Sequence, residues 1–141
     1  MIEIKRVDSR DLRLFDDVAD DVFDETIDPV RLKTYLASSS HHMVVALNDG
    51  QIVGQCAAVI HHHPDKQTEL YIDEVGTAPS FQRQGIARRM LEEMFVIGKE
   101  QGCEEVWVGT EPDNEAARKL YETREGLAGP AETFVMYVYK L

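Results

Sequence analysis

A glycine turn between two regular elements is the first stretch of this sequence whose residues suggest chemistry. Gln82-Arg-Gln-Gly-Ile-Ala87 follows a strand-like apolar run and opens a helix-like run. The first turn of a helix presents free N–H groups, and a glycine lets a phosphate group approach them closely. The stretch has neither the Gly-Lys-Ser/Thr of a Walker loop nor the glycine triplet of a dinucleotide site. The residues alone leave two interpretations: an anion site, or an ordinary turn whose arginines are solvated.

Two titratable side chains, Glu74 and Tyr121, are of the types that transfer protons. Glu74 lies in the middle of the strand before the glycine turn, where partial burial raises the pKa of a carboxyl group towards that of a useful base. Strand alternation sends its neighbour Asp73 to the opposite face. Tyr121 follows Asn114 by seven residues, so two helical turns place both on one stripe, about 10 Å apart. The structural alternatives are an ion pair for Glu74, a helix cap for Asn114 and core packing for Tyr121.

An acidic run separates the first strand from the rest of the chain. Between Asp16 and Asp28 there are seven carboxylates and no Lys or Arg. The pattern predicts a helix from Asp8 or Ser9 to about Glu25, apolar on one half, although each like-charged i,i+4 pair costs about 0.2–0.5 kcal/mol. The net charge of −11 disfavours nucleic acid as a partner and favours cationic ligands. A solvated face that aids solubility is the alternative interpretation.

The remaining elements follow from hydrophobic periodicity and turn residues. The sequence predicts strands over 2–7, 43–47, 51–60, 68–77, 105–108 and 133–139, the fifth of them buried. It predicts further helices over 28–38, 83–101 and 114–124, and a hairpin turn at 48–50. This order indicates an α/β protein with a mixed sheet and helices on both faces, in a single domain over residues 1–141.

The termini and cysteines indicate where the protein works. Met1-Ile-Glu-Ile-Lys-Arg6 carries charge where a signal peptide or membrane span requires an apolar run. Cys56 and Cys103 are far apart and match no metal or redox spacing. We therefore expect a cytoplasmic protein with no membrane partner.

Three consecutive histidines, His61-His-His63, invite a metal interpretation. Alternation sends His61 and His63 to one face, but no cysteine nearby completes a set of four ligands. The sequence therefore predicts a hairpin end with partly exposed imidazoles and no metal.

The two motifs together resemble a known family. Gln82-x-x-Gly85-x-Ala87, after the strand end Val75-Gly-Thr-Ala-Pro79, resembles the Gln/Arg-x-x-Gly-x-Gly/Ala signature of the GNAT superfamily of acyl-CoA N-acyltransferases. The run from Asn114 to Tyr121 resembles that family's second motif, and the order of elements matches from about residue 2 to 140. Two motifs in the right order are more specific than either alone. The resemblance implies a GNAT-like fold, a mostly antiparallel sheet with a splayed parallel pair.

The resemblance also implies roles for individual residues. It implies acetyl-CoA as co-substrate and no metal, with Glu74 as the base for the amine and Tyr121 as the acid for the thiolate. The positions implied for the cofactor are Val75, Thr77, Gln82, Arg83, Gln84, Gly85, Ile86, Ala87 and Asn114. In this family the first helices wall the acceptor site, so Asp24, Glu25 and Asp28 are candidates for binding the substrate.

The leading prediction is an N-acetyltransferase for a primary amine of a small cationic molecule, similar to an aminoglycoside or a polyamine. The stretch Glu74-Val-Gly-Thr77 and the glycine turn look similar to those of aminoglycoside N-acetyltransferases, but these motifs bind cofactor rather than acceptor. The alternatives are a protein or peptide N-acetyltransferase and a non-catalytic acyl-CoA-binding module. Dimers are common in the family, which leaves a homodimer open. Leu127 replaces an aromatic that often follows the last helix, which puts the acceptor-side packing in doubt.

Overall fold

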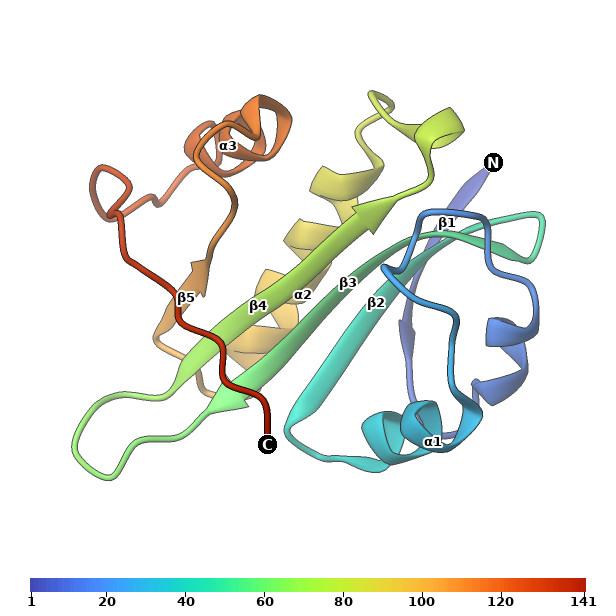
Figure 1. Ribbon diagram of the computed structural model, residues 1–141, viewed down its shortest axis with the longest axis horizontal. Helices are drawn as coiled ribbons and strands as arrows, with labels where there is room; N and C mark the ends of the chain where they lie inside the picture. Colours follow the sequence, from blue (N-terminus) through green and yellow to red (C-terminus); the bar gives the residue numbers. More distant parts are fainter. The chain divides into compact units, whose positions relative to one another are not determined.

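The structure, a computed structural model, describes residues 1–141. The chain divides into two compact units, residues 1–109 and 110–141. The first unit contains the sheet and most of the helical residues (Figure 1). Its elements are β1 (Ile2–Val7), the 3₁₀ helix η1 (Leu12–Asp16), α1 (Pro29–Ala37), β2 (His41–Asn48), β3 (Gln51–His61), β4 (Glu69–Thr77), the 3₁₀ helix η2 (Pro79–Phe81), α2 (Ile86–Glu100) and β5 (Glu105–Val108).

Five strands form one sheet in the order β1-β2-β3-β4-β5. The first three pairings are antiparallel and β4 pairs with β5 in parallel, which confirms the expected mixed sheet (Figure 1). The turn between β2 and β3 has Asp49 and Gly50 at φ 48° and 84°, the left-handed conformation that a two-residue hairpin requires. β5 is an edge strand whose residues alternate between exposed and half-buried, so the prediction that it is buried is wrong.

The helix α2 packs against one face of the sheet and lies behind it in Figure 1. Met90, Leu91 and Met94 of α2 are fully buried. Two glycines permit the close approach: a Cβ on Gly54 would lie 3.0 Å from the Met90 side chain, and one on Gly98 3.0 Å from Leu70. This tight packing fixes the start of α2, and therefore the glycine turn, relative to the end of β4.

The predicted helix from residue 8 or 9 to 25 is wrong. Only the short η1 (Leu12–Asp16) is helical, and the chain then runs beside β3, where Val18 forms a parallel bridge with Ile52. Ala19 N donates to Ile52 O at 2.8 Å, and Ile52 N donates to Asp17 O at 2.9 Å. Pairing with β3 therefore satisfies backbone hydrogen bonds of this segment. It also avoids the i,i+4 repulsion between carboxylates that a helix would impose.

A one-residue bulge in β4 sets the direction of its side chains. In the pairing with β3, Ile72 faces Ala58 and Glu74 faces Ala57, so Asp73 is the extra residue. A bulge breaks the two-residue alternation of a strand. Leu70 and Ile72 therefore lie on the α2 side, whereas Glu74 turns to the other face. The prediction that Asp73 and Glu74 lie on opposite faces is wrong for this reason.

The second unit contains α3 (Glu115–Glu122) followed by a segment without regular structure. The predicted strand over residues 133–139 is wrong: these residues form no strand, and their large apolar side chains are exposed. An alternating pattern becomes a strand only where neighbouring backbone groups pair with it, and residues 110–141 contain no strand. The single-domain organisation remains a prediction. No helix in either unit has the length and apolarity needed to cross a membrane.

Candidate active site

The carboxylate of Glu74 lies on the face of the sheet opposite α2, between polar and acidic neighbours. Its pKa is raised, first by partial burial and then by the negative charges of Asp24 and Asp73, while the amide of Gln55 lowers it. The residue is half-buried in the sheet interior rather than at a wet strand end. A carboxylate of this kind is a stronger base than an exposed one, because protonation relieves both its desolvation and its repulsion.

The acidic segment, residues 16–28, lies close to Glu74 because it crosses β4 at Gly76. A Cβ on Gly76 would lie 2.3 Å from the carbonyl oxygen of Val22, a separation that only glycine permits. Beneath it, the fully buried Gln55 donates from Nε2 to the same carbonyl oxygen at 3.4 Å. The segment that carries Asp24 is thus held against the strand that carries Glu74, and the charge of Asp24 acts on that carboxylate.

Asp73 and Tyr35 complete the surroundings of Glu74. Asp73 is exposed, yet protein atoms around its carboxylate still raise its pKa, an effect that the charge of His41 opposes. Tyr35 of α1 donates its hydroxyl hydrogen to His42 O at 2.8 Å. Burial, followed by the charge of Asp73, raises the pKa of Tyr35, and Glu74 adds to this effect. Three carboxylates and a neutral phenol therefore define a site that attracts cations.

Glu25 and Asp28 are the other two residues predicted to bind the substrate. Glu25 is exposed, whereas Asp28 stabilises the start of α1. The Asp28 carboxylate caps α1 and accepts hydrogen bonds from Val30 N at 2.9 Å and Arg31 N at 3.0 Å. These bonds lower the pKa of Asp28. The acidic run therefore separates into a helix cap at Asp28 and a charge beside the candidate base at Asp24.

Alanine variants of these two aspartates should have opposite effects. Asp28→Ala should lower the melting temperature by roughly 2–6 °C because it removes the α1 cap, with little change in substrate affinity. Asp24→Ala should leave the melting temperature nearly unchanged and lower kcat/KM for a cationic amine. Thermal unfolding combined with steady-state kinetics checks both expectations. A drop in kcat/KM without destabilisation for Asp28→Ala would instead give that residue the binding role.

The strands β4 and β5 separate beside Glu74. Their parallel pairing runs from Glu69↔Glu105 to Ile72↔Val108 and stops there, while β4 continues to Thr77. Backbone groups on this edge of β4, at Val75 and Thr77, therefore have no strand partner beyond β3. The Thr77 hydroxyl is buried without a hydrogen-bond partner. An extended ligand with amide groups could pair with this open edge.

The glycine turn leaves the start of α2 uncapped. Arg83 and Gly85 both have positive φ, 62° and 76°, and Gly85 occupies the N-cap position without a side-chain hydrogen bond. The first intrahelical bond runs from Arg89 N to Gly85 O at 3.1 Å, so the amides of Ile86 and Ala87 precede it. A Cβ on Gly85 would meet no atom within 4 Å, so the space beside this residue is open. An anion at this point would meet both backbone donors and the positive end of the helix dipole.

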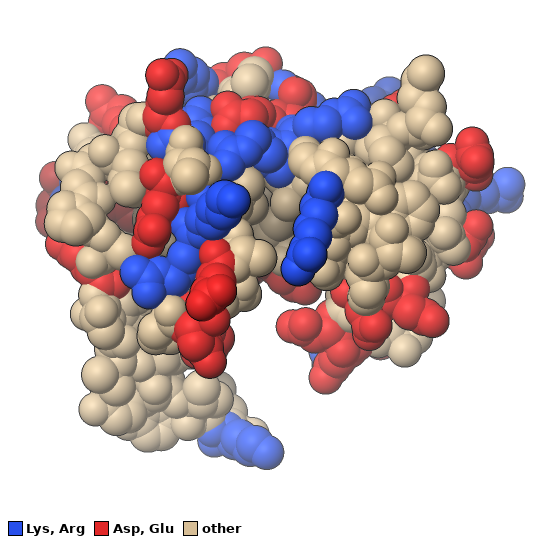
Figure 2. Space-filling view, turned by 90° about the horizontal axis from the view of Figure 1, so that it is seen from above, with Lys and Arg blue, Asp and Glu red and all other residues tan.

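The side chains of the turn have different tasks. Gln82 Nε2 donates to Thr77 O at 3.2 Å and Gln84 Nε2 donates to Ser80 O at 3.4 Å, so both brace the loop. Arg89 Nη2 donates to Ile2 O at 3.2 Å, which anchors α2 to β1. Arg83 is exposed. Figure 2 shows Lys and Arg side chains lying among Asp and Glu on the face that it draws, despite the acidic sequence.

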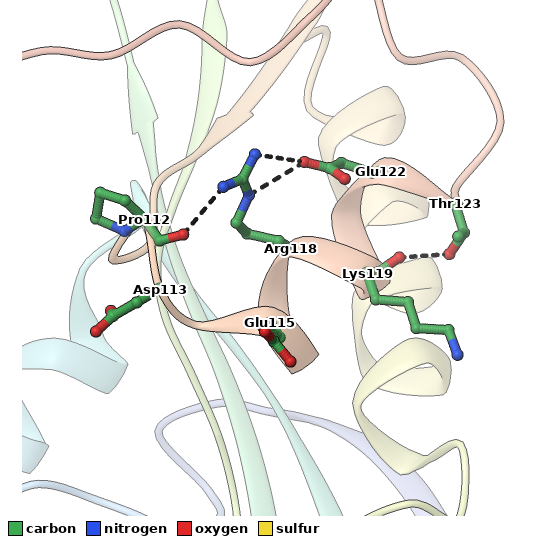
Figure 3. A pocket seen from close by; sticks show the side chains of 7 residues that line it. All are labelled: Pro112, Asp113, Glu115, Arg118, Lys119, Glu122 and Thr123. Carbon is green, nitrogen blue, oxygen red and sulfur yellow. Dashed lines mark hydrogen bonds and ion pairs between the residues drawn. The ribbon is translucent and has the colours of Figure 1, made fainter.

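In the second unit, Asn114 and Tyr121 lie at the two ends of α3. Asn114 Oδ1 accepts a hydrogen bond from Ala117 N at 3.1 Å, so Asn114 caps the helix, as its structural alternative predicts. Tyr121 is half-buried. A depression of about 430 Å³ beside α3 is lined by Pro112, Asp113, Glu115, Arg118, Lys119, Glu122 and Thr123 (Figure 3).

Two of the charged side chains in this depression, Arg118 and Glu122, are paired with each other. Arg118 forms an ion pair with Glu122 at 3.2 Å and donates to Pro112 O at 3.0 Å, as the dashed lines in Figure 3 show. The Arg118 guanidinium therefore already binds α3 and the loop that precedes it. We assign no catalytic role to this depression.

Three residues around Glu74 were missed by sequence reasoning. Gln55 had a visible signal, because it is the only polar residue in the run from Ile52 to Ile60. Asp73 was excluded by an alternation that the bulge overturns. Tyr35 had no signal, since nothing in its helix indicates that its hydroxyl reaches the strands.

Comparison with known proteins identifies the family. Residues 8–126 match the Acetyltransferase (GNAT) family, so the chain belongs to it, which confirms the resemblance of the two motifs. The fold agrees with an aminoglycoside acetyltransferase, meta-AAC0020 from an uncultured soil metagenomic sample, solved in complex with sisomicin. That structure has a TM-score of 0.80 and 22% sequence identity, and the match covers 99% of this chain and 97% of that one.

Two curated relatives match part of the sequence. Aminoglycoside N(6')-acetyltransferase type 1 of Salmonella typhimurium is 26% identical over 82 residues, which cover 55% of this chain and 57% of the relative. N-alpha-acetyltransferase 30 of Schizosaccharomyces pombe is 30% identical over 78 residues, which cover 55% of this chain and 52% of the relative. This chain thus spans about half the length of the curated relatives it matches.

Proposed function

We propose that this protein is an acetyl-CoA-dependent N-acetyltransferase that acetylates a primary amine of a small cationic molecule. The observation that carries the proposal is the half-buried Glu74, with its raised pKa, one residue before the open edge of β4. The family uses acetyl-CoA as its acyl donor. The uncapped start of α2 offers its backbone donors to the pyrophosphate, and the edge at Val75 and Thr77 offers hydrogen bonds to the pantetheine arm.

In the proposed reaction, the amine nitrogen attacks the thioester carbonyl carbon, an N–C bond forms and the C–S bond breaks. Glu74 takes the proton that the ammonium group loses before attack, directly or through water. This matters because an amine of pKa about 9–10 is mostly protonated at neutral pH. Tyr121 supplies a proton to the departing thiolate. The second proton, lost from nitrogen as the N–C bond forms, replaces the one that Tyr121 gives to the thiolate. The products are the N-acetylated amine and free coenzyme A.

The charges around Glu74 support a cationic acceptor. Asp24 and Asp73 act on the same carboxylate, and no basic side chain contributes to the shift of its pKa. A second ammonium group on the substrate would therefore find a carboxylate next to the reacting amine. Relatives named as aminoglycoside acetyltransferases, one of them bound to sisomicin, are consistent with this substrate class.

A peptide N-terminus is the second candidate acceptor. The specific observation in its favour is the similarity to N-alpha-acetyltransferase 30, which is slightly higher in identity than that to the aminoglycoside enzyme. A peptide would bring a single terminal ammonium group, whereas an aminoglycoside or polyamine brings several. The acidic surroundings of Glu74 favour the acceptor with several charges.

Release of free thiol from acetyl-CoA across a panel of amines tests the proposal. The panel contains aminoglycosides, linear polyamines, peptides with free N-termini and uncharged amine analogues. We expect the highest kcat/KM for polycationic small molecules and the lowest for the uncharged analogues. Turnover of peptides alone would instead support a peptide N-terminus as the acceptor. Cofactor binding without release for any amine would indicate a non-catalytic acyl-CoA-binding module.

Replacing the Tyr121 hydroxyl tests the proposed acid. Tyr121→Phe should lower kcat by about 10²-fold, the low end for acid–base groups, because a thiol of pKa about 8.5 is already a fair leaving group. The loss should shrink with acyl donors whose thiols are more acidic. A loss that is independent of the leaving group would mean that Tyr121 packs rather than donates a proton.

A further inference from the structure

The hairpin between β3 and β4 brings two histidines and a glutamate together. His61, the last residue of β3, is the direct cross-strand partner of Glu69, the first residue of β4. His63 lies two residues beyond His61, so all three side chains come to the same end of this strand pair. Glu69 precedes Glu74 by five residues, roughly 16 Å along the strand, which makes this cluster separate from the candidate active site.

The donor atoms of these residues are spaced as metal ligands are. One ligand atom from each of His61, His63 and Glu69 lies within 4.8 Å of the other two. His63 Nε2 and Glu69 Oε2 are 3.4 Å apart. Zinc–ligand bonds of about 2.0–2.1 Å in a tetrahedron separate neighbouring ligand atoms by about 3.4 Å. Small side-chain rotations of the exposed His61 would bring the third donor to the same distance.

An ordinary ion pair does not account for this arrangement. His63 Nε2 is buried and has no assigned hydrogen-bond partner, although Glu69 Oε2 lies 3.4 Å away. The side chains of His63 and Glu69 are only 14% and 17% exposed, so water does not readily supply the missing hydrogen bond. The rings of His61 and His63 also lie 4.2 Å apart at 38°, an arrangement that two protonated imidazoles would oppose. A buried ring nitrogen and a carboxylate oxygen 3.4 Å apart are spaced so that one cation could be ligated by both.

The carboxylate is held in place by a residue from a third strand. Trp107 of β5 donates from Nε1 to Glu69 Oε2 at 2.8 Å, and its ring stacks on Tyr71 with centroids 4.0 Å apart. Metal-binding carboxylates commonly receive such a hydrogen bond, which fixes their orientation. The cluster therefore has ligands from two strands and an orienting donor from the neighbouring strand.

We propose that His61, His63 and Glu69 bind one divalent transition-metal ion, with zinc as the best fit and water as the fourth ligand. Two imidazoles and one carboxylate suit zinc, cobalt or nickel, whereas magnesium and calcium require mainly oxygen ligands. The bound ion would tie the end of β3 to β4 and, through Trp107, to β5. The sequence-based expectation of no metal required a nearby cysteine and did not consider Glu69, which only the strand pairing brings to the histidines.

The single tryptophan of the chain makes the site observable. Cobalt added to tag-free protein should quench Trp107 fluorescence in a saturable way, and zinc should reverse the quenching. Calorimetry with zinc should give one ion per chain. The variants His61→Ala, His63→Ala and Glu69→Gln should each weaken zinc binding at least tenfold. His62→Ala is the matched control, a histidine of the same turn outside the cluster, and should bind zinc with unchanged affinity.

The comparison of variants decides the proposal. Equal weakening by His62→Ala and His61→Ala would mean adventitious binding to surface imidazoles and would overturn it. Unchanged affinity in Glu69→Gln, or the absence of saturable binding in the parent protein, would do the same. Because His61 is exposed, His61→Ala should fold normally, which circular dichroism checks. The readouts do not involve acetyl transfer, so they stand whatever the outcome of the amine panel.

Discussion

Glu74→Gln should lower kcat/KM for the amine by about 10²–10⁴-fold at neutral pH, the range for a lost general base. Glutamine preserves the size and the hydrogen-bonding capacity of the side chain but cannot accept the proton of an ammonium group. The variant should keep its affinity for coenzyme A, since the turn at Gly85 and the edge of β4 are unchanged. Steady-state kinetics and calorimetry with coenzyme A measure the two quantities.

The activity difference between the parent enzyme and Glu74→Gln should depend on pH. The base works only when deprotonated, so the parent enzyme should lose activity as pH falls through the raised pKa of Glu74. At a pH above the pKa of the amine, about 9–10, free amine is abundant and the base matters less. The difference between parent and variant should therefore be largest at lower pH, above the pKa of Glu74, and should narrow as pH rises. A constant ratio at every pH would remove Glu74 as the base.

Asp73→Asn is the matched control on the same strand. It removes a neighbouring negative charge that raises the pKa of Glu74, but it leaves the carboxylate of Glu74 in place. Its acidic limb should move to lower pH, with a much smaller loss at neutral pH than in Glu74→Gln. A loss as large as that of Glu74→Gln would make Asp73 the more important carboxylate.

Gly85→Val should weaken coenzyme A binding by roughly 10²–10⁴-fold while the protein remains folded. The added side chain would enter the open space beside Gly85, the residue that precedes the Ile86 and Ala87 amides. Displacing the phosphate from two charge-assisted hydrogen bonds loses about 1.5–3 kcal/mol for each. Calorimetry with coenzyme A measures the affinity, and thermal unfolding measures the cost of the backbone strain.

The other end of α2 supplies the control. Gly102 has φ 81°, close to the 76° of Gly85, and a Cβ there would also meet no atom within 4 Å. Gly102→Val should therefore cause similar backbone strain and a similar drop in melting temperature, with no effect on coenzyme A. If both variants weakened binding equally, strain rather than a blocked anion site would be the cause.

Local patterns were sufficient for the elements that position the glycine turn. The alternation in β1 (Ile2–Val7), the hairpin at 48–50 and the apolar run of β3 each point to one structure, and the structure has it. The pattern of α2 placed its end correctly before Gly102, although η2 and the turn delay its start to Ile86. In these stretches local propensity and tertiary packing favour the same conformation.

The wrong predictions of secondary structure concern segments whose conformation is decided by tertiary packing. Residues 9–25 have the periodicity of an amphipathic helix, but the backbone of Ile52 offers hydrogen bonds that the helix could not match. Residues 133–139 have the alternation of a strand, but a strand also requires a partner, which no periodicity reveals. The candidate base Glu74 could be found from its position before the turn. That Asp24, Asp73 and Gln55 meet at Glu74 could not be found, because the bulge and the crossing at Gly76 bring them together.

The extra residue in β4 gives the site two adjacent carboxylates that a regular strand would separate. With regular pairing, Asp73 would face Ala57 and the carboxylate of Glu74 would turn into the apolar layer beneath α2. Deleting Asp73 would remove the extra residue and leave Glu74 opposite Ala57, on its present face. Such a deletion should therefore keep the base and remove only a neighbouring negative charge that raises its pKa.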